Sequence, residues 1–237
     1  SDLFGMNAAG TDAKMRNTKE SILEAQFTSG AGNWCTWMFG RDLVNWNNNF
    51  TWAKWVTPSR DLISAFKQEG DEVRFKESIV YYDCNWSNYY PSDNYPFMYK
   101  CRSANSSIIK YRYADVLLLK AEALIMQDTP DLEGAADIID EVRDRAKLGA
   151  LPTSVRSNKN VLLNALLKER RLELAFEGQR WFDLVRLDKV EEVMNAVYSK
   201  DSGRKAQIYT FDKNSYRLPI PQSVIDANDK IHQNPGY

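Results

Sequence analysis

The pattern of apolar and polar positions divides the chain into an irregular first part and a helical second part. Between about residues 108 and 197, apolar residues recur at spacings of three and four, the period of a helix with one buried face. Before residue 108 this period is largely absent, and Gly, Pro and Asn interrupt short apolar runs. We therefore expect a loop-rich region with short strands over 1–107, a helical region over 108–197 and an extended tail over 198–237.

Two short elements are predicted in the first region. Alternating apolar and polar residues indicate a strand within 19–27. Ser59 can cap a short amphipathic helix over 59–68, and Gly70 provides its stop. Residues 71–107 contain two prolines and are expected to form short strands and loops.

The first two predicted helices form a hairpin. One covers 109–126, and the other starts near Pro130 with Thr129 as its N-cap and ends before Gly149. A loop of a few residues joins them, so they must pack antiparallel, in the pattern typical of tetratricopeptide-like hairpins. Their apolar faces are expected to carry Tyr113, Leu117, Ala121 and Leu124 on the first helix, and Leu132, Ala135, Ile139, Val142 and Ala146 on the second.

The rest of the chain is expected to hold two more helices and a tail. The helices are predicted over 160–176 and 179–197, separated by Gly178 in a left-handed cap. In the tail, two prolines restrict the residues before them to extended geometry over 216–221. A short helical turn is predicted over 222–227.

The charge balance excludes some classes of partner. The chain carries 31 basic and 32 acidic residues, a net charge of −1. Electrostatics therefore gives no reason to expect nucleic acid or an anionic membrane surface as a partner. No run of about 20 apolar residues predicts a transmembrane helix, and no signal peptide is visible in the first residues.

Few side chains suit metal or cofactor chemistry. His232 is the only histidine, so neither a histidine metal cluster nor a Ser-His-Asp triad can be built, and no phosphate-binding glycine motif occurs. We therefore expect no cofactor and no metal. Cys35, Cys84 and Cys101 are too widely spaced for a zinc site. One disulfide with a free thiol, and three free thiols, both remain open.

Tryptophan and asparagine are concentrated in one stretch. Five of the seven tryptophans lie within 34–55, interleaved with asparagines. Indole faces can cover the C–H faces of sugar rings, each worth roughly 1 kcal/mol for about 50 Å² buried, while polar side chains bond the hydroxyls. The alternative is that the tryptophans are packing anchors. The candidate ligand-binding residues are Trp34, Trp37, Arg41, Asp42, Trp46, Asn47, Asn49, Tyr82 and Trp86.

Acidic and basic residues alternate through 169–186. They are Glu169, Arg170, Arg171, Glu173, Glu177, Arg180, Asp183 and Arg186. Paired carboxylates could serve a glycosidase. A structural network fits the pattern better, because nearly every charge has an opposite neighbour in the same two helices and the arginine fork suits carboxylates. We expect this network to fix the angle between the helices, and we expect no catalytic residues.

Four segments in order resemble the SusD/RagB family of outer-membrane nutrient-binding proteins. The first is 112–124, beginning Arg-Tyr-Ala-Asp, and the second is 135–146. The third is 169–186, with Glu-Arg-Arg-Leu-Glu-Leu-Ala-Phe-Glu-Gly. The fourth is Leu-Pro-Ile-Pro at 218–221 together with Gln-Asn-Pro-Gly-Tyr at 233–237. Weaker similarity extends upstream through most of the chain.

The resemblance implies both a fold and a function. The fold would be mostly α with irregular loops, short strands and tetratricopeptide-like hairpins. The function would be non-catalytic binding of a glycan at the cell surface and its delivery to a SusC-like TonB-dependent transporter. The same architecture could instead bind peptides or other nutrients, or serve as a helical protein-interaction scaffold.

The resemblance also implies a location and a longer parent protein. Family members are about twice this length, so the chain reads as the C-terminal portion of such a protein. The full-length protein would be a lipoprotein of the outer membrane, anchored through its N-terminal part, and this fragment itself would be soluble.

Overall fold

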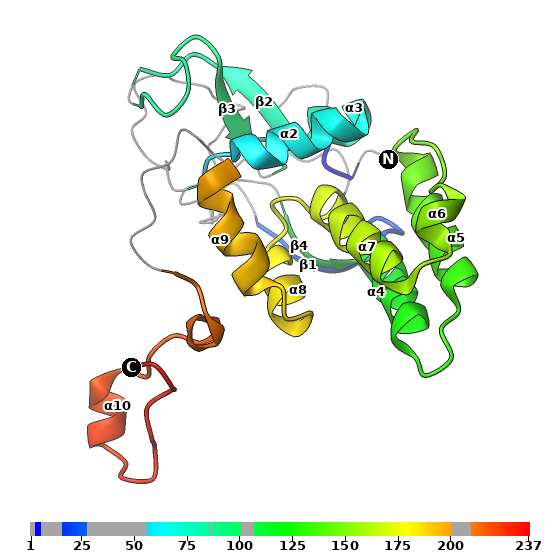
Figure 1. The fold of residues 1–237 in the computed structure, drawn as a ribbon. Helices are drawn as coiled ribbons and strands as arrows, with labels where there is room; N and C mark the ends of the chain where they lie inside the picture. The colour runs from blue at the N-terminus through cyan, green and yellow to red at the C-terminus, as the bar shows by residue number, and fades with distance from the viewer. Residues whose placement is uncertain (1–2, 6–15, 28–55, 86, 101–106, 201–209) are drawn as a thin grey trace. The chain divides into compact units, whose positions relative to one another are not determined.

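The computed structural model describes residues 3–5, 16–27, 56–85, 87–100, 107–200 and 210–237. The chain divides into two compact units, Ser1–Arg180 and Trp181–Tyr237. In the described parts, helices dominate and the strands are short (Figure 1). The expected fold class, mostly α with short strands, is confirmed.

The first unit contains two small antiparallel sheets. Strand β1 (Ser21–Ala25) pairs with β4 (Ile108–Arg112), which lies far from it in the sequence. Strand β2 (Ile79–Tyr82) pairs with its neighbour β3 (Tyr95–Met98) as a hairpin. The strand predicted within 19–27 is therefore confirmed.

Two short helices follow one another before β2. Helix α2 (Arg60–Glu69) starts at Ser59, whose side chain accepts a backbone hydrogen bond of the first turn, and stops at Gly70, which has a φ of 69°. This helix was predicted. Helix α3 (Glu72–Ser78), capped by Asp71, was not, because loops and strands were expected there. A seven-residue helix makes only two turns, too few to show an apolar period.

The helical core is built by α4 (Tyr113–Met126), α5 (Leu132–Arg145) and α7 (Lys159–Glu173), with the short α6 (Thr153–Arg156) beside them. Helices α4 and α5 form the predicted hairpin. The buried residues of this core are Leu118, Ala121, Ile125, Ala135, Ala136, Ile139, Val142, Leu151, Leu162 and Leu166. Alanines on both helices allow close approach of the two backbones.

The predicted face of the first hairpin helix was partly right: Ala121 is fully buried and Leu117 and Leu124 pack against the core, but Tyr113 does not. The helix begins at Tyr113 rather than at residue 109, because the preceding residues form β4. Its fully buried residues include Leu118 and Ile125, whereas Tyr113 is 52% exposed. The helix is apolar on nearly every side, so spacing alone left its buried face ambiguous. The face predicted for α5 is confirmed at Ala135, Ile139 and Val142.

The cap predicted for the second hairpin helix was wrong. Thr129 and Pro130 were expected to start it, but the helix begins at Leu132 with Asp131 as its N-cap. The Asp131 carboxylate accepts a hydrogen bond of 2.9 Å from the amide of Gly134. A carboxylate in this position also interacts favourably with the positive end of the helix dipole.

A strained turn ends α7. The helix was predicted to reach residue 176 but ends at Glu173, and the chain then turns through left-handed conformations at Phe176 (φ 65°) and Gly178 (φ 81°). Glycine adopts this geometry freely, whereas for phenylalanine it is costly. The turn projects Glu177 back towards the end of the helix, where ionic contacts hold it.

The second unit begins with two helices where one was predicted. The region 179–197 was expected to be a single helix, but it is divided into α8 (Arg180–Arg186) and α9 (Val190–Lys200). Between them Asp188 has a φ of 54°. Aspartate tolerates this conformation better than most residues, so the break occurs without Gly or Pro and was not visible in the sequence.

Side-chain hydrogen bonds join residues 218–220 of the tail to its C-terminal end. The tail contains the 3-10 turn η1 (Lys213–Tyr216) and helix α10 (Gln222–Asp226), which agrees with the turn predicted over 222–227. The Gln233 side chain accepts from the Ile220 amide at 2.7 Å and donates to the Ile220 carbonyl at 2.9 Å. The Asn234 side chain donates to the Leu218 carbonyl at 2.6 Å. We call these contacts the terminal clasp, and they explain why the two tail motifs occur together.

Candidate functional site

The structure describes one of the predicted ligand-binding residues, Tyr82. The others lie outside the described residues: Trp34, Trp37, Arg41, Asp42, Trp46, Asn47, Asn49 and Trp86. Of the three cysteines, Cys84 is a buried free thiol, and the remaining two also lie outside. The aromatic and asparagine-rich stretch therefore stays a prediction.

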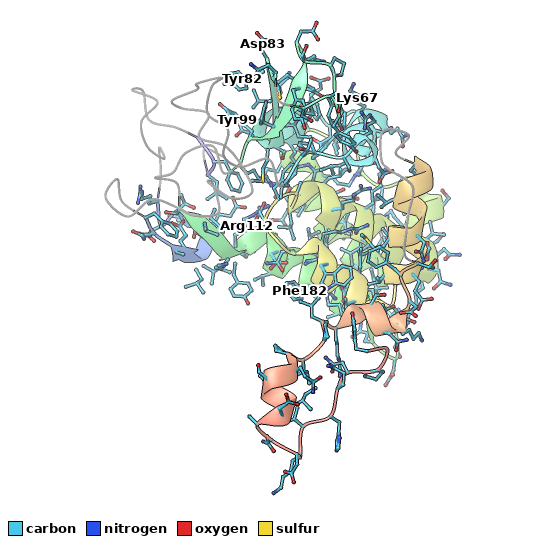
Figure 2. The ribbon with its side chains drawn as sticks, turned by 90° about the vertical axis from the view of Figure 1, so that its left-hand side faces the viewer. Lys67, Tyr82, Asp83, Tyr99, Arg112 and Phe182 are labelled. Atoms are coloured by element: carbon cyan, nitrogen blue, oxygen red, sulfur yellow. The ribbon has the colours of Figure 1, made fainter. Side chains whose placement is uncertain are left out.

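Tyr82 lies on an aromatic face of the β2–β3 hairpin. Its ring meets that of Phe97 edge to face, with 6.3 Å between centroids, and Phe97 in turn lies 5.3 Å from Tyr95. Tyr82 and Asp83 lie at the loop end of this hairpin, whereas Tyr99 follows β3 at the opposite end, where its amide donates to the Ser78 carbonyl at 2.8 Å (Figure 2). Tyr82 is half-buried, so the hairpin presents part of an aromatic ring next to an exposed carboxylate.

The neighbouring tyrosines are engaged in packing. The Arg60 guanidinium carbon lies 4.3 Å from the ring centroids of both Tyr89 and Tyr90, a cation–π arrangement. The Tyr90 hydroxyl donates to the Pro58 carbonyl at 2.7 Å. These contacts fix the loop between β2 and β3 against the start of α2, so both tyrosines take part in packing.

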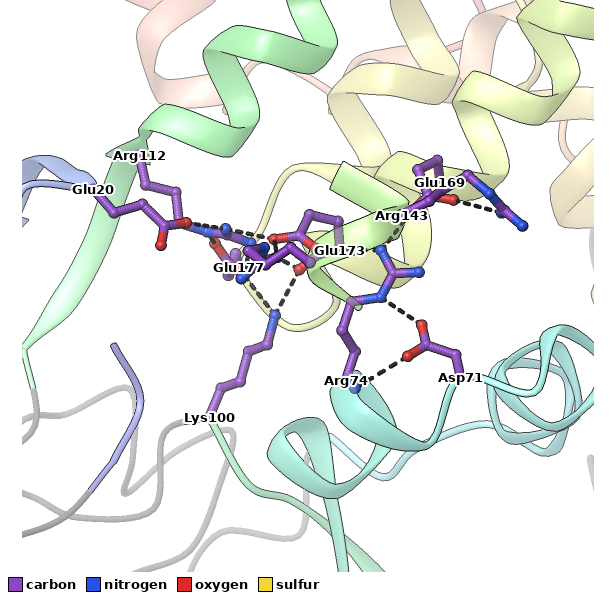
Figure 3. A network of polar contacts seen from close by, with 10 residues as sticks. Glu20, Asp71, Arg74, Lys100, Arg112, Arg143, Glu169, Glu173 and Glu177 are labelled. Atoms are coloured by element: carbon purple, nitrogen blue, oxygen red, sulfur yellow. Dashed lines mark hydrogen bonds and ion pairs between the residues drawn. The ribbon is translucent and has the colours of Figure 1, made fainter. Parts of the chain in front are cut away.

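A buried ion network occupies the centre of the first unit (Figure 3). Three of its six carboxylates come from α7 and the turn after it, and its cations come from α3, α5, β4 and the residues just after β3. The members are Glu20, Glu69, Asp71, Arg74, Lys100, Arg112, Arg143, Arg145, Glu169, Glu173 and Glu177. The network joins segments that are otherwise held by separate apolar clusters.

Glu173 is the most connected carboxylate of the network. It is 2% exposed and forms ion pairs with Arg112 at 2.6 Å and Arg74 at 3.2 Å, and a third with Arg145. Burial by itself would raise its pKa, but Arg112, Arg145 and the other cations outweigh burial and hold the pKa at about 2. Glu173 is therefore charged at every physiological pH.

Glu177 is held by two cations at the strained turn. Its carboxylate pairs with Lys100 at 2.6 Å and with Arg112 at 2.7 Å. Burial opposes ionisation, yet these two cations lower the Glu177 pKa. Lys100 also donates to the Glu173 carbonyl at 2.8 Å. These bonds fix the backbone of the turn after α7 in its left-handed geometry.

At Glu169 the effects of burial and of the neighbouring cations on the pKa combine to the opposite result. Glu169 is 2% exposed and pairs with Arg74 at 2.5 Å and Arg143 at 3.2 Å. Here burial outweighs both cations, and the pKa of Glu169 is raised. Two glutamates one helical turn apart are thus shifted in opposite directions.

The glutamates of 169–186 pair with cations from outside that segment, contrary to our expectation. Arg170 pairs with Asp115 at 2.9 Å and Arg171 with Asp61 at 2.6 Å. Within the segment, Arg186 pairs with Asp183 at 2.8 Å, and Arg180 donates to the Leu167 carbonyl at 3.2 Å. The difference arises because residues four apart share one helix face, and that face meets other elements.

Sequence reasoning missed the main cations of the network. Arg74 lies on a helix that was not predicted, and Lys100 on a segment expected to be irregular. Arg112 was part of a recognised motif but had no assigned partner. The available signal was the spacing of four between Glu169, Glu173 and Glu177, because carboxylates on a side that becomes buried need cations beside them.

The network does not have the features of a catalytic carboxylate pair. A glycosidase needs two carboxylates that reach the sugar on either side of its glycosidic bond. Here the three glutamates are buried, and each is bonded to at least two cations. In the described part of the chain, no three or more acidic, His or Cys side chains form a group suited to a metal ion. The arrangement supports a structural role.

An apolar cavity of about 340 Å³ lies beside the network. Phe4, Val56, Met98 and Phe176 contribute apolar surface, and Lys100 lies at its polar side. A cavity of this size and composition can hold the apolar part of a small ligand.

Comparison with known proteins identifies the family. The model of the SusD family matches residues 93–237, more than half of the chain. The chain therefore belongs to the SusD family, and the resemblance seen in its motifs is confirmed.

Individual relatives agree with this assignment. SusD-like protein P38 of Formosa agariphila is 43% identical over 99 residues, which cover 39% of this chain and 19% of that protein. A SusD superfamily structure from Bacteroides vulgatus has a TM-score of 0.69 at 20% identity and covers 100% of this chain and 54% of its own. A laminarin-binding SusD-like protein has a TM-score of 0.63 at 25% identity, with coverages of 94% and 51%. The chain thus spans about half the length of these solved structures. Among the described helices, none is long and apolar enough to cross a membrane.

Proposed function

We propose that this protein is a non-catalytic glycan-binding protein of the outer-membrane surface. It captures an oligosaccharide and delivers it to a SusC-like TonB-dependent transporter, and a lipid anchor on its N-terminal part holds it at the membrane. Membership of the SusD family carries this proposal. The similarity to a laminarin-binding protein over 94% of the chain supports a glycan as the ligand.

The buried ion network narrows the search for the ligand site. Its charges are used within the protein, so ligand contacts must come from other residues. The stretch around Trp46 supplies aromatic rings and amides in the combination that suits sugars. Two or three such rings, after the costs of binding, give affinities in the range of roughly millimolar to micromolar. Weak binding suits a receptor that must release its ligand to a transporter.

A fluorescence titration tests this proposal. Laminarin oligosaccharides and a panel of other glycans are added to the protein and to its Trp46→Ala variant. We expect saturable binding of at least one glycan and its loss in the variant, with unchanged circular dichroism. Trp181→Phe is the matched control, because Trp181 packs near Phe211 with 6.4 Å between rings. If the folded protein binds no glycan, the proposal is wrong for this chain.

A second candidate function is a helical protein-interaction scaffold. The side of α4 that faces away from the core carries an apolar stripe, in which Tyr113, Val116, Leu119 and Met126 are 52%, 45%, 40% and 51% exposed. Exposed apolar side chains gathered on one side of a helix favour a protein partner. Co-purification with a SusC-like transporter, lost on Leu119→Asp while glycan binding is kept, would assign this stripe to the transporter. Capture of a peptide in place of any glycan would instead favour another nutrient.

A further inference from the structure

An open cleft of about 440 Å³ lies where the residues just before β1 meet helices α4 and α5. Its floor is apolar, with Leu117 of α4 and Val142 of α5 among the lining residues. Tyr113 also lines it and is 52% exposed. We call this space the Tyr113 cleft. It combines an accessible aromatic ring with an apolar floor, and none of the residues predicted to bind a ligand belongs to its described lining.

Backbone hydrogen bonds and helix packing hold the walls of the cleft in place. The Tyr113 amide donates to the Glu20 carbonyl at 2.7 Å, and the Ser21 amide donates to the Thr18 carbonyl at 3.1 Å. These bonds fix the turn that carries Lys19 against the start of α4. Helices α4 and α5 form the packed hairpin of the core. The cleft therefore has its shape before a ligand binds.

Two charged side chains of the lining are not used within the protein. Lys19 and Glu141 are exposed, and in the described part of the chain neither side chain has a hydrogen bond or an ion pair. Arg145, four residues after Glu141 and so on the same face of α5, pairs with Glu173 and keeps 39% of its side chain exposed. The two free charges are of opposite sign, so they give an ionic ligand no net attraction.

These features favour an uncharged ligand that carries hydroxyl groups. Lys19 offers only donors and Glu141 only acceptors, and sugar hydroxyls can serve both, whereas an anion or a cation would meet a like charge at one of them. The C–H face of a sugar ring can cover the Tyr113 ring and the apolar floor. An apolar protein surface would instead remove water from both charges without giving them partners. Pockets of about 300–1,000 Å³ hold drug-sized ligands, so the volume suits a mono- or disaccharide unit.

We propose that the Tyr113 cleft is a further carbohydrate subsite, in which an uncharged sugar unit stacks on Tyr113 and its hydroxyls bond to Lys19 and Glu141. This inference rests on the proposed function and adds to it a location and a ligand class, a glycan with neutral units. Of the apolar stripe on α4, Tyr113 lines the cleft and Leu119 does not. A sugar in the cleft and a protein partner at Leu119 can therefore be tested separately.

Methyl resonances locate binding in solution. Protein with isotope-labelled leucine methyl groups is titrated with laminarin oligosaccharides and the other glycans of the panel, and tryptophan fluorescence is followed on the same samples. We expect saturable shifts at Leu117 and none at Leu162, which is fully buried in the core. Tyr113→Ala should raise the Kd measured at Leu117 about fivefold, because stacking on one ring face is lost. Tyr113→Phe keeps the ring and should bind like the wild type.

The matched control is Tyr111→Ala. Tyr111 is 53% exposed and is not among the residues that line the cleft, so its loss should leave the Kd at Leu117 unchanged. Circular dichroism confirms the folding of each variant. Equal Kd values at Leu117 in the wild type and in folded Tyr113→Ala would overturn the proposal.

Variants of the charged lining residues test the polar contacts. Lys19→Met and Glu141→Ala should each raise the Kd about tenfold, and Glu141→Gln, which keeps an acceptor, should raise it less. Because the ligand is uncharged, added sodium chloride should not weaken binding. Binding that weakens steeply with salt would mean an ionic ligand and would contradict the assigned class.

The two readouts separate failure of this inference from failure of the proposed function. Glycan binding seen by tryptophan fluorescence without shifts at Leu117 would overturn the subsite and leave the proposed function standing. No glycan binding by either readout would overturn both. Shifts at Leu117 caused by a peptide mixture from digested casein, and not by any glycan, would make the cleft a peptide site and would also overturn the proposal.

Discussion

Replacing Glu173 by glutamine removes one charge from the centre of the buried ion network without changing the size of the side chain. In the wild type this carboxylate meets Arg112 at 2.6 Å and Arg74 at 3.2 Å, and also pairs with Arg145. In Glu173→Gln these guanidinium groups lose a shared counter-ion. Breaking a buried ion pair in this way costs about 3–5 kcal/mol, because a buried charge is left uncompensated.

The pKa of Glu173 gives a separate measure of the same effect. Its value is about 2 against an ordinary 4.5, and each pKa unit corresponds to about 1.4 kcal/mol, so folding favours the charged form by about 3 kcal/mol. The folded-state pKa is the lower one. The stabilisation is therefore complete above about pH 4.5 and is lost as the pH falls towards 2. At pH 7 the free energy from the pKa difference is therefore similar to the cost of breaking the buried ion pairs.

Urea unfolding followed by circular dichroism measures the effect. At pH 7 we expect Glu173→Gln to lower the free energy of unfolding by about 3–5 kcal/mol. The difference from wild type should shrink between pH 4.5 and pH 2, because protonated Glu173 resembles glutamine. The control is Glu72→Gln, whose pair with Lys76 at 3.0 Å is 76% and 73% exposed and contributes about 0–1 kcal/mol. A loss below about 1 kcal/mol at pH 7, or a difference that does not change with pH, would refute the reasoning.

Three further predictions concern other parts of the molecule. Glu169→Gln should lower the free energy of unfolding at pH 7 by less than Glu173→Gln does, because burial outweighs the cations around Glu169 and raises its pKa. The wild type should gain stability relative to this variant as the pH falls from 7 towards 4.5, because the raised pKa favours proton uptake by the folded state. Urea unfolding over that pH range checks both expectations. Gly70→Ala should lower the Tm through a loss of about 1 kcal/mol, because its φ is 69° with open space around it. Gln233→Ala removes both side-chain bonds to Ile220, so hydrogen exchange at the Ile220 amide should accelerate about tenfold, whereas Gln222→Ala should leave it unchanged.

Local signals predicted the elements whose ends are determined locally. Ser59 and Gly70 define α2, since a side-chain cap and a left-handed glycine need only their own neighbours. The apolar face of α5 could also be predicted, because its other side is polar. Helix α4 was different, since it is apolar nearly all round and its buried face is chosen by α5 and α7. The break at Asp188 has no local signal strong enough to show in the sequence.

The partners of the buried charges depend on tertiary structure. The spacing of Glu169, Glu173 and Glu177 places three carboxylates on one side of a helix and its following turn, but it does not say which cations approach them. Those cations lie on α3, β4 and α5 and just after β3, and their approach is decided by how these elements pack. The ligand-binding residues proposed around Trp46 remain a prediction, which the glycan titration tests.

The sequence distances spanned by the buried ion network have a consequence for folding kinetics. The bond between Arg74 and Glu169 joins residues 95 apart, and that between Arg112 and Glu173 joins residues 61 apart. Long loops must close before such bonds form, so we expect them to be absent from the folding transition state. Weakening the network should then leave the refolding rate nearly unchanged and shorten the lifetime of the native state. A loss of about 3 kcal/mol that acts on unfolding alone corresponds to a roughly hundredfold faster unfolding rate. The buried ion network therefore largely determines the lifetime of the native state.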